Sequence, residues 1–218
     1  MSLVLRECNK KNIIMKIFTK ILTYFIFPVV IIILIYALYE SVMRPVRFNK
    51  AVDQRTAVAV DRLKDIRTLQ VAYKSQTGRF LSTLDSLVDY YHNGQLVVVK
   101  QIGSEDDSVA VAQKLVRRDS ILIFVRDTLL KDRAALVDSI KYIPFSGGVK
   151  TNMETVVKLV SGINVPLFEA YMPYDDLLKG LNRQLIVNLK AEKEDLNRYP
   201  GLKVGSVTSP NNNAGNWE

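Results

Sequence analysis

The feature that most constrains this chain is an apolar stretch near its N-terminus, Ile21–Tyr39, which reads ILTYFIFPVVIIILIYALY. Its 19 residues include no charged side chain, and only Thr23 and Pro28 interrupt the aliphatic and aromatic run. At about 1.5 Å per residue, a helix of this length spans roughly 28 Å, which is close to the hydrocarbon thickness of a bilayer. The stretch therefore predicts a transmembrane helix over residues 21–43, and Pro28 is expected to kink it.

The residues after this stretch argue against a cleaved secretory signal. A signal peptide has a shorter apolar region that ends in small residues at a cleavage site. Here the chain continues as YALYESVMRP, which is bulky and charged and lacks an A-x-A pattern. We therefore expect an uncleaved signal anchor, with the lipid bilayer as its first partner.

The basic residues around the span indicate its orientation. Five of them precede the span, against one acid, and three follow it closely. This bias predicts that residues 1–20 stay in the cytoplasm and that the rest of the chain lies outside the inner membrane. Translation from Met15 would leave only Lys16 and Lys20 before the span, and the bias would then disappear.

An amphipathic helix is predicted next, over Lys50–Gln76. Positions at alternating steps of four and three share one face; they are Val52, Thr56, Ala59, Leu63, Ile66, Gln70 and Tyr73. The remaining positions carry charges, Asp65 among them, and Gly78 supplies the left-handed turn that ends a helix. We expect this neck, 44–78, to pack on its own domain. A coiled coil is the alternative, although Thr and Gln make a weak seam.

Residues 79–208 predict a head domain that mixes helices and strands. A short helix capped by Ser82 or Thr83 is expected through LDSLVDYYHN, and a longer helix over Pro173–Leu196. Runs rich in β-branched residues predict strands between these helices; they are QLVVVKQI (Gln95–Ile102), VAVAQKLV, SILIFVRDTLL, VDSIKYIPF, METVVKLV and INVPLFEAYMP.

Two of these segments carry a further expectation. LLKDRAALVDSI also fits one or two helical turns, and Pro166 places the last of the strands at an edge or a bulge. After one more strand in LKVGSV, the polar residues 209–218 predict a mobile tail. The expected fold class is α+β: a transmembrane helix, an amphipathic neck helix, and a small head with a mainly antiparallel sheet and a C-terminal helix.

The composition removes most familiar catalytic and metal sites. The chain has one cysteine, Cys8, and one histidine, His92, so an intrachain disulfide, a two-His metal site and a zinc finger are excluded. There is no G-x-S-x-G elbow, and Gly147-Gly148 lacks the length and ending of a P-loop. The acidic run SEDDS, Ser104–Ser108, lacks the spaced ligands of a calcium loop and predicts a hairpin tip. We expect no catalytic residue, no metal and no cofactor.

The net charge of +8 does not indicate a nucleic-acid partner. Half of the charge precedes Ile21, and the remainder is spread over the long soluble part without a run of Lys and Arg interleaved with aromatic residues. A nucleic-acid interface usually concentrates its basic residues on one face or one helix. We therefore expect no nucleic acid to bind.

One segment, Arg62–Tyr91, resembles a part of the type IV pilins and pseudopilins; it reads RLKDIRTLQVAYKSQTGRFLSTLDSLVDYY. In that family a helix with a basic face ends in a Tyr-Lys…Thr-Gly-Arg turn, and a short L-D-S-L helix follows. A short basic leader, an apolar helix that continues as an amphipathic one, and an α+β head complete the plan. The resemblance covers the chain up to Tyr91 and implies a setting in secretion or cell-surface assembly.

Two positions depart from the pilin pattern. Ile17 stands where pilin precursors have a glycine before the mature Phe-Thr start, and Leu22 stands where they have a glutamate. Leader-peptidase processing and pilin-type registration in a fibre are therefore not expected. The full chain, including KVGSVTSPNNNAGNW, is also similar to a family of bacterial single-pass membrane proteins, which implies an envelope location and supplies no activity.

These observations support three hypotheses of function. The leading one is a non-catalytic envelope protein that contacts other envelope proteins, or itself, through the neck face at Leu63, Ile66 and Tyr73. Such positions are also ordinary core positions. The second is a membrane-tethered enzyme or small-ligand binder, which requires ionisable groups that converge in a cleft. The third is a fibre subunit cleaved near Phe18.

Overall fold

The structure of this chain is a computed structural model that describes residues 19–20, 22–102 and 117–218. It divides into two compact units, Met1–Lys50 and Ala51–Glu218. Several sequence predictions lie outside the described residues: the cytoplasmic segment up to residue 18, Cys8, the departure at Ile17, the acidic run at 104–108 and the strand expected at 109–116.

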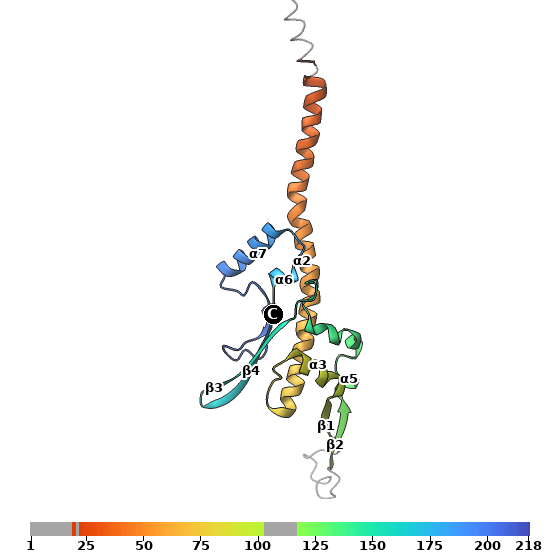
Figure 1. Ribbon diagram of the computed structural model, residues 1–218, viewed down its shortest axis with the longest axis vertical. Coiled ribbons are helices and arrows are strands. Elements are labelled where there is room, and N and C mark those ends of the chain that lie inside the picture. Colours follow the sequence, from red (N-terminus) through yellow and green to blue (C-terminus); the bar gives the residue numbers. More distant parts are fainter. Residues whose placement is uncertain (1–18, 21, 103–116) are drawn as a thin grey trace, which may run out of the picture. The chain divides into compact units, whose positions relative to one another are not determined.

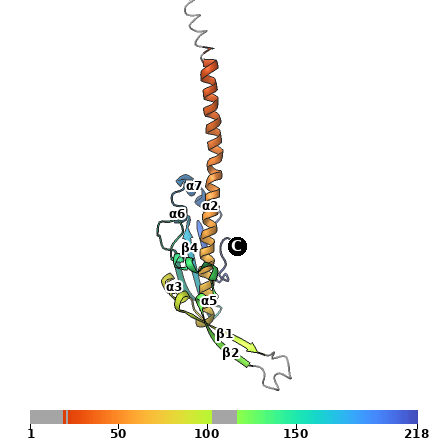
Figure 2. The ribbon, with the colours of Figure 1, turned by 90° about the vertical axis from the view of Figure 1, so that its right-hand side faces the viewer.

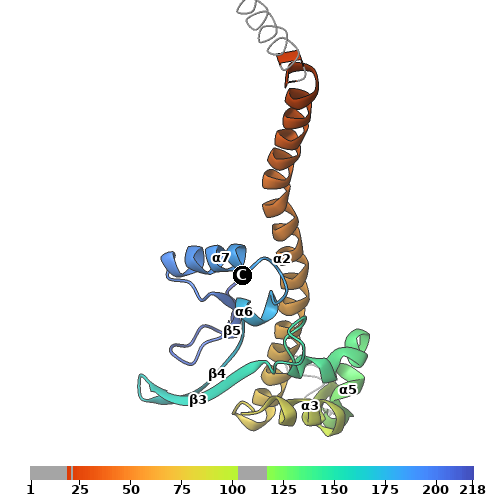
Figure 3. The same cartoon turned by 45° about the horizontal axis from the view of Figure 1, so that its top comes forward.

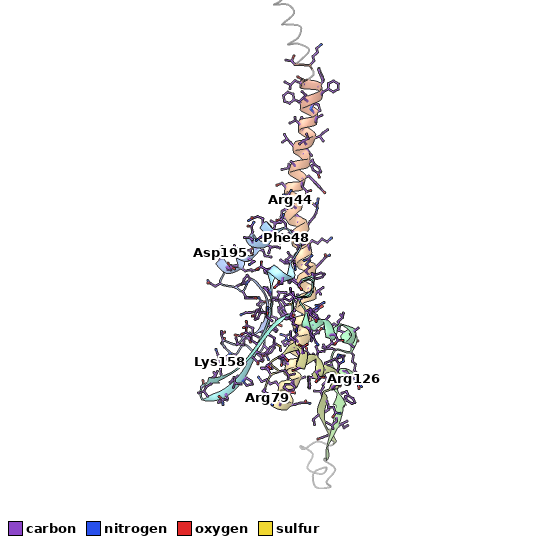
Figure 4. The ribbon with its side chains drawn as sticks, viewed as in Figure 1. Arg44, Phe48, Arg79, Arg126, Lys158 and Asp195 are labelled. Carbon is purple, nitrogen blue, oxygen red and sulfur yellow. The ribbon has the colours of Figure 1, made fainter. Side chains whose placement is uncertain are left out.

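The N-terminal unit contains the predicted apolar helix. A π-helix, η1, covers Leu22–Ile26, and helix α2, Phe27–Thr77, begins directly after it and continues into the second unit. None of its apolar window is buried, and the side chains surround the helix (Figure 4). Among the residues that the structure describes, this is the one helix long and apolar enough to cross a membrane.

The change from π to α geometry falls where the sequence predicted a kink. Pro28 is the second residue of α2, and because proline has no N–H it cannot continue the hydrogen bonds of the π-helix that directly precedes α2. Pro45 lies inside α2, and its ring removes the hydrogen bond to the carbonyl of Ser41. Just beyond the apolar stretch, Arg47 pairs with Glu40 at 3.2 Å.

The second unit is built around the C-terminal part of α2. One face of this part is buried at steps of about one helical turn; it carries Ala59, Leu63, Ile66, Leu69 and Gln70. The helix ends at Thr77, and Gly78, with φ +74°, donates its N–H to the carbonyl of Lys74 at 2.8 Å. The predicted amphipathic helix and its glycine stop are confirmed.

A short helix, α3, follows over Leu84–Asn93. Thr83 is its N-cap, and the threonine side chain accepts a hydrogen bond from the N–H of Ser86 at 3.2 Å. Of the two predicted caps, Ser82 and Thr83, the second is therefore the correct one. Before this helix, Phe80 packs on Phe168 with ring centroids 4.7 Å apart. The turn between α2 and α3 is thereby fixed to a strand far along the chain.

Strands β1, Gln95–Ile102, and β2, Arg117–Phe124, form an antiparallel two-stranded ribbon. Strand β1 has the predicted bounds. Helix α5, Val125–Thr128, follows β2 directly and contacts α3. Figures 1 and 2 show the ribbon projecting from α3 and α5, away from the other sheet.

The prediction of a strand in VDSIKYIPF, residues 137–145, is wrong. Most of this run belongs to a 3₁₀ helix, η2, Lys131–Lys141, so the helical alternative for LLKDRAALVDSI is the correct one. Val137 and Ile140 are both buried and three residues apart, which is the repeat of a 3₁₀ helix rather than the alternation of a strand. Only the single bridge of Tyr142 with Lys150 retains β character.

The second sheet has three antiparallel strands in the order β3-β4-β5. They cover Asn152–Val160, Ile163–Pro173 and Gly201–Gly205. Strand β4 is central, but β5 pairs only with its last five residues. Pro166 therefore pairs with β3 alone and lies at a local edge, in agreement with the prediction.

The prediction of a single helix over Pro173–Leu196 is wrong. The structure contains two helices, α6, Tyr174–Leu177, and α7, Arg183–Asp195 (Figure 3). Gly180 between them has φ +87°, which breaks the helix, and Asn182 begins the second one as its N-cap.

Residues 209–218, for which a mobile tail was predicted, fold back on β5. The N–H of Gly205 donates to the carbonyl of Ala214 at 3.0 Å, and the N–H of Asn216 donates to that of Lys203 at 3.0 Å. With helices, a two-stranded sheet and a three-stranded sheet, the second unit has the predicted α+β class.

The buried amide of Gln70 gives a test of this core. Its Nε2 donates to the carbonyl of Leu81 at 2.8 Å, and its Oε1 accepts the N–H of Leu81 at 3.0 Å. Gln70→Ala leaves both backbone groups without partners, so we expect the free energy of unfolding to fall by about 1–3 kcal/mol. Urea unfolding of the full chain in mild detergent, followed by the fluorescence of Trp217, measures this change.

The matched control is Gln54→Ala, because Gln54 is an exposed glutamine on the same helix. Its replacement should change the free energy of unfolding by less than about 0.5 kcal/mol. Equal losses in the two variants would contradict a structural role for the Gln70 amide.

Candidate functional site

The neck face predicted to contact partners lies inside the second unit instead. Leu63 and Ile66 have no exposed surface, because the same face of α2 packs in the core. Tyr73 is half-buried, and its ring meets that of Tyr90 edge-on, with centroids 5.1 Å apart. Leu63 and Ile66 are therefore core residues, which corrects their assignment to a contact face.

Helix α2 holds later parts of the unit through arginine side chains that the sequence placed on its charged side. Arg55 donates to the carbonyls of Leu177 and Lys179, at 3.2 and 2.9 Å, where α6 ends. Carbonyls at a helix C-terminus lack partners within the helix and form the negative end of its dipole. A guanidinium satisfies both requirements, so Arg55 fixes α6 to α2.

Arg62 makes the same kind of contact at the end of η2, with the carbonyls of Ser139 and Tyr142 at 3.0 and 2.6 Å. Burial lowers the pKa of Arg62 below its usual value, because a buried cation loses hydration. Arg67 completes the series with a 2.6 Å bond to the Glu218 carboxylate. Three later segments are thus held by one helix.

Asp65 is a buried carboxylate that the sequence assigned to the charged side of the same helix. Its side chain faces Arg133 of η2 at 3.0 Å, and the residue is only 3% exposed. Burial raises the pKa of Asp65, the charge of Arg133 opposes the rise and that of Asp61 adds to it, and the pKa that results is about 6. The pair joins η2 to α2.

His92 was expected as an exposed or half-buried residue beside a turn, and the structure places it half-buried near the end of α3. Its Nε2 lies 3.0 Å from Oδ1 of Asp138 in η2. This contact links the two helices at the surface. Within the described ranges, no group of three or more His, Cys, Asp or Glu side chains is placed to hold a metal ion.

The ribbon β1–β2 exposes apolar side chains on both of its faces. Val97 and Leu122 pair across the strands and are 54% and 64% exposed, while the next pair, Val98 and Ile121, is 41% and 47% exposed. Successive residues of a strand point to opposite faces, so the two pairs lie on opposite sides of the ribbon. Each side of the ribbon therefore exposes one apolar pair.

The sequence contained a signal for this surface. The run LVVV in Gln95–Ile102 is continuous rather than alternating, so apolar side chains fall on both faces of the strand. Such a run is typical of a strand covered on both sides. In the described part of the chain, no other layer of the fold covers either face of the ribbon.

A second exposed strip continues the core face of the three-stranded sheet. The register puts Val157 and Leu159 on the same face as Phe168, which is fully buried. Val157 and Leu159 are nevertheless 61% and 71% exposed, because they lie toward the turn between β3 and β4. Lys158 lies between them, and its Nζ donates to the carbonyl of Thr208 at 3.1 Å (Figure 4).

The chain therefore combines a long N-terminal apolar helix with a small α/β domain, an arrangement consistent with a pilin-like architecture. Comparison with models of known protein families, with curated proteins and with solved structures finds no match to this chain.

Asp65 predicts a pH dependence of stability with a defined sign. Its pKa is about 6 in the folded chain and about 3.9 in an unfolded chain. The folded state therefore binds the proton more tightly, and the contribution of Asp65 to stability rises as the pH falls from ~7 to ~4. The gain is at most about 3 kcal/mol and is complete below the unfolded pKa.

Urea unfolding of the full chain and of Asp65→Asn at a series of pH values isolates this contribution. The asparagine does not titrate, so the difference in free energy of unfolding between the two proteins should grow in favour of the natural chain as the pH falls. Asp53→Asn, an exposed change on the same helix, serves as the control. A constant difference between the natural chain and Asp65→Asn would rule out the buried carboxylate as its source.

Proposed function

We propose that this chain is a non-catalytic, membrane-anchored protein of the bacterial cell envelope that contributes an α+β unit to a secretion or cell-surface assembly. The unburied apolar window of α2 supports the anchor. The excess of basic residues before this window supports an inner-membrane location, with Ala51–Glu218 outside the cytoplasm. The pilin-like order of elements supports the kind of assembly.

The observation that carries the proposal is the apolar surface on both faces of ribbon β1–β2. A two-stranded ribbon is marginally stable alone in water, so exposed apolar residues on both sides are a liability unless a partner covers them. Full burial of a Val or Leu side chain contributes about 1.5–3 kcal/mol. The four half-exposed side chains, Val97, Val98, Ile121 and Leu122, would add about 1 kcal/mol each on association, before the cost of ordering.

The partner that fits this surface is another envelope protein with an apolar groove. A groove covers both faces of an inserted ribbon, whereas a flat surface covers one. The strip at Val157 and Leu159 supplies a second apolar contact on the same unit. A second copy of this chain is the other source of such a groove, and the experiment below separates the two.

A photo-crosslinking amino acid at Leu122, introduced in cells that express the full chain, should give a defined cross-linked product. A product of twice the mass identifies a second copy, and any other reproducible mass identifies a different partner. The same probe at Leu136, a leucine on η2 that is 54% exposed against 64% for Leu122, should give little or no product. Equal products from both positions would contradict a specific role for the ribbon.

Leu122→Lys tests the energetic contribution of the ribbon. A charge on its apolar face should reduce recovery of the partner in mild detergent about 5- to 30-fold, since a lost anchor contact in an interface costs about 1–2 kcal/mol. Leu136→Lys is the control. Unchanged recovery with Leu122→Lys would overturn the assignment.

The anchor is tested in the middle of the apolar window. Ile31→Arg combined with Leu34→Arg should abolish the membrane fraction that resists alkaline carbonate extraction, because each arginine at the centre of a membrane helix costs about 2.5–3.5 kcal/mol. Val46→Arg, on the same helix but past the apolar stretch, should remain in the membrane. Loss of the natural chain and of both variants from the carbonate-resistant fraction would contradict a spanning helix.

A further inference from the structure

A cavity of about 550 Å³ lies in the second unit where α7, strand β5 and the C-terminal residues meet. Figure 3 shows α6, α7 and β5 around this region. The residues that give it chemical character are Lys193 from α7, Arg198 and Tyr199 from the loop after it, Lys203 from β5, Trp217 from the C-terminal segment and Thr56 from α2. Segments from the full length of the unit thus contribute to one polar cavity.

The backbone at the end of α7 positions two of these cations. Asn197 is left-handed, with φ +53°, and its N–H donates to the carbonyl of Glu194 at 2.8 Å. The N–H of Arg198 donates to the carbonyl of Lys193 at 2.8 Å, which completes a Schellman motif. The motif joins the backbones of Lys193 and Arg198, which both line the cavity, and among the described residues neither side chain has an ion-pair partner.

The other charges at the cavity are neutralised by close partners. Lys203 lies 3.7 Å from the carboxylate of Glu169. Glu218, the one acidic residue among those lining the cavity, is held by Arg67, whose Nη1 lies 2.6 Å from Oε1 of its side chain. Lys193 and Arg198 therefore leave the wall with an excess of positive charge. Burial, with nearby acids, raises the pKa of Tyr199 to about 12, so its phenol remains a donor at neutral pH.

Two buried polar atoms at this cavity have no hydrogen-bond partner. They are Nε1 of Trp217 and Oγ1 of Thr56, and in the described part of the chain only one other side-chain atom, Oδ1 of Asp65, shares this property. The Asp65 oxygen faces Arg133, so its environment is accounted for. Buried donors without acceptors are rare in folded proteins and require an explanation. A ligand rich in acceptor oxygens supplies one.

We propose that this cavity binds a phosphate-bearing ligand between Lys193, Arg198 and Trp217. Arginine presents a planar fork that matches a phosphate, and lysine adds a mobile point charge. The indole N–H and the Thr56 hydroxyl add two more donors. Together these donors exceed what the two oxygens of a carboxylate ligand would accept, so a phosphate fits better. Trp217 Nε1 and Thr56 Oγ1 both have almost no exposed surface, so the indole and the hydroxyl must both turn to reach the ligand.

The sole tryptophan of the chain reports binding directly. The full chain in neutral-detergent micelles, titrated with inorganic pyrophosphate at constant ionic strength, should show a saturable change in Trp217 fluorescence. A second titration compares phosphatidylcholine vesicles with and without phosphatidic acid. A response to pyrophosphate assigns a free phosphate compound, and a response to phosphatidic acid alone assigns a lipid headgroup. Both results support the site.

Arg198→Gln and Lys193→Gln should each weaken binding at least about tenfold, because each removes a charge-assisted contact. Arg198→Lys should lose less than Arg198→Gln, and Arg183→Gln, the same charge change at the other end of α7, should bind like the natural chain. Absence of a saturable response to both probes, or equal affinity in Arg198→Gln and Arg183→Gln, would overturn the proposal. The ribbon contact is independent of this outcome, because none of these substitutions lies on β1 or β2.

Discussion

The second unit depends on the packing of the buried face of helix α2. The three-stranded sheet is a single layer, and a single layer cannot cover its own apolar face. Helix α2 supplies residues such as Leu63 and Ile66 to that core. Its polar side chains then bind groups from later segments: Arg55 holds the end of α6, Arg62 the end of η2, and Gln70 the turn before α3. One helix therefore supplies both the packing and the polar contacts that position the other elements.

Elements that depend on local rules were predictable from the sequence. The Thr83 hydroxyl caps α3, Gly78 ends α2, and β1 begins and ends as its β-branched run indicates. The position of Pro166 at a local edge was also predictable, because proline has no N–H to donate to a strand on its other side. In each case the determining chemistry lies within a few residues of the element, so no knowledge of the rest of the fold is required.

Features that depend on distant segments were not predictable. Leu63 and Ile66 have the same pattern in the sequence whether they form a contact face or part of a core, and only the fold shows that they are buried. Asp65 shares the spacing of exposed charges, yet it is buried and pairs with Arg133, far along the chain. The cavity draws its residues from α2, α7, β5 and the C-terminal segment, so no linear motif announces it. Gly180, whose left-handed backbone separates α6 from α7, lies inside the run that predicted a single helix.

The bonds from Arg67 to the C-terminal residues also constrain how the protein is made. Arg67 donates to Asn213 and Glu218, partners 146 and 151 positions later in the chain. Such nonlocal contacts form slowly, because a long loop must close before they stabilise anything. On a ribosome that adds residues one at a time, α2 emerges early and waits with its apolar face uncovered until the last strand is synthesised. A chain that ends shortly before residue 213 lacks both partners of Arg67, whereas one that ends before β5, Gly201–Gly205, also leaves the apolar face of α2 uncovered and open to aggregation.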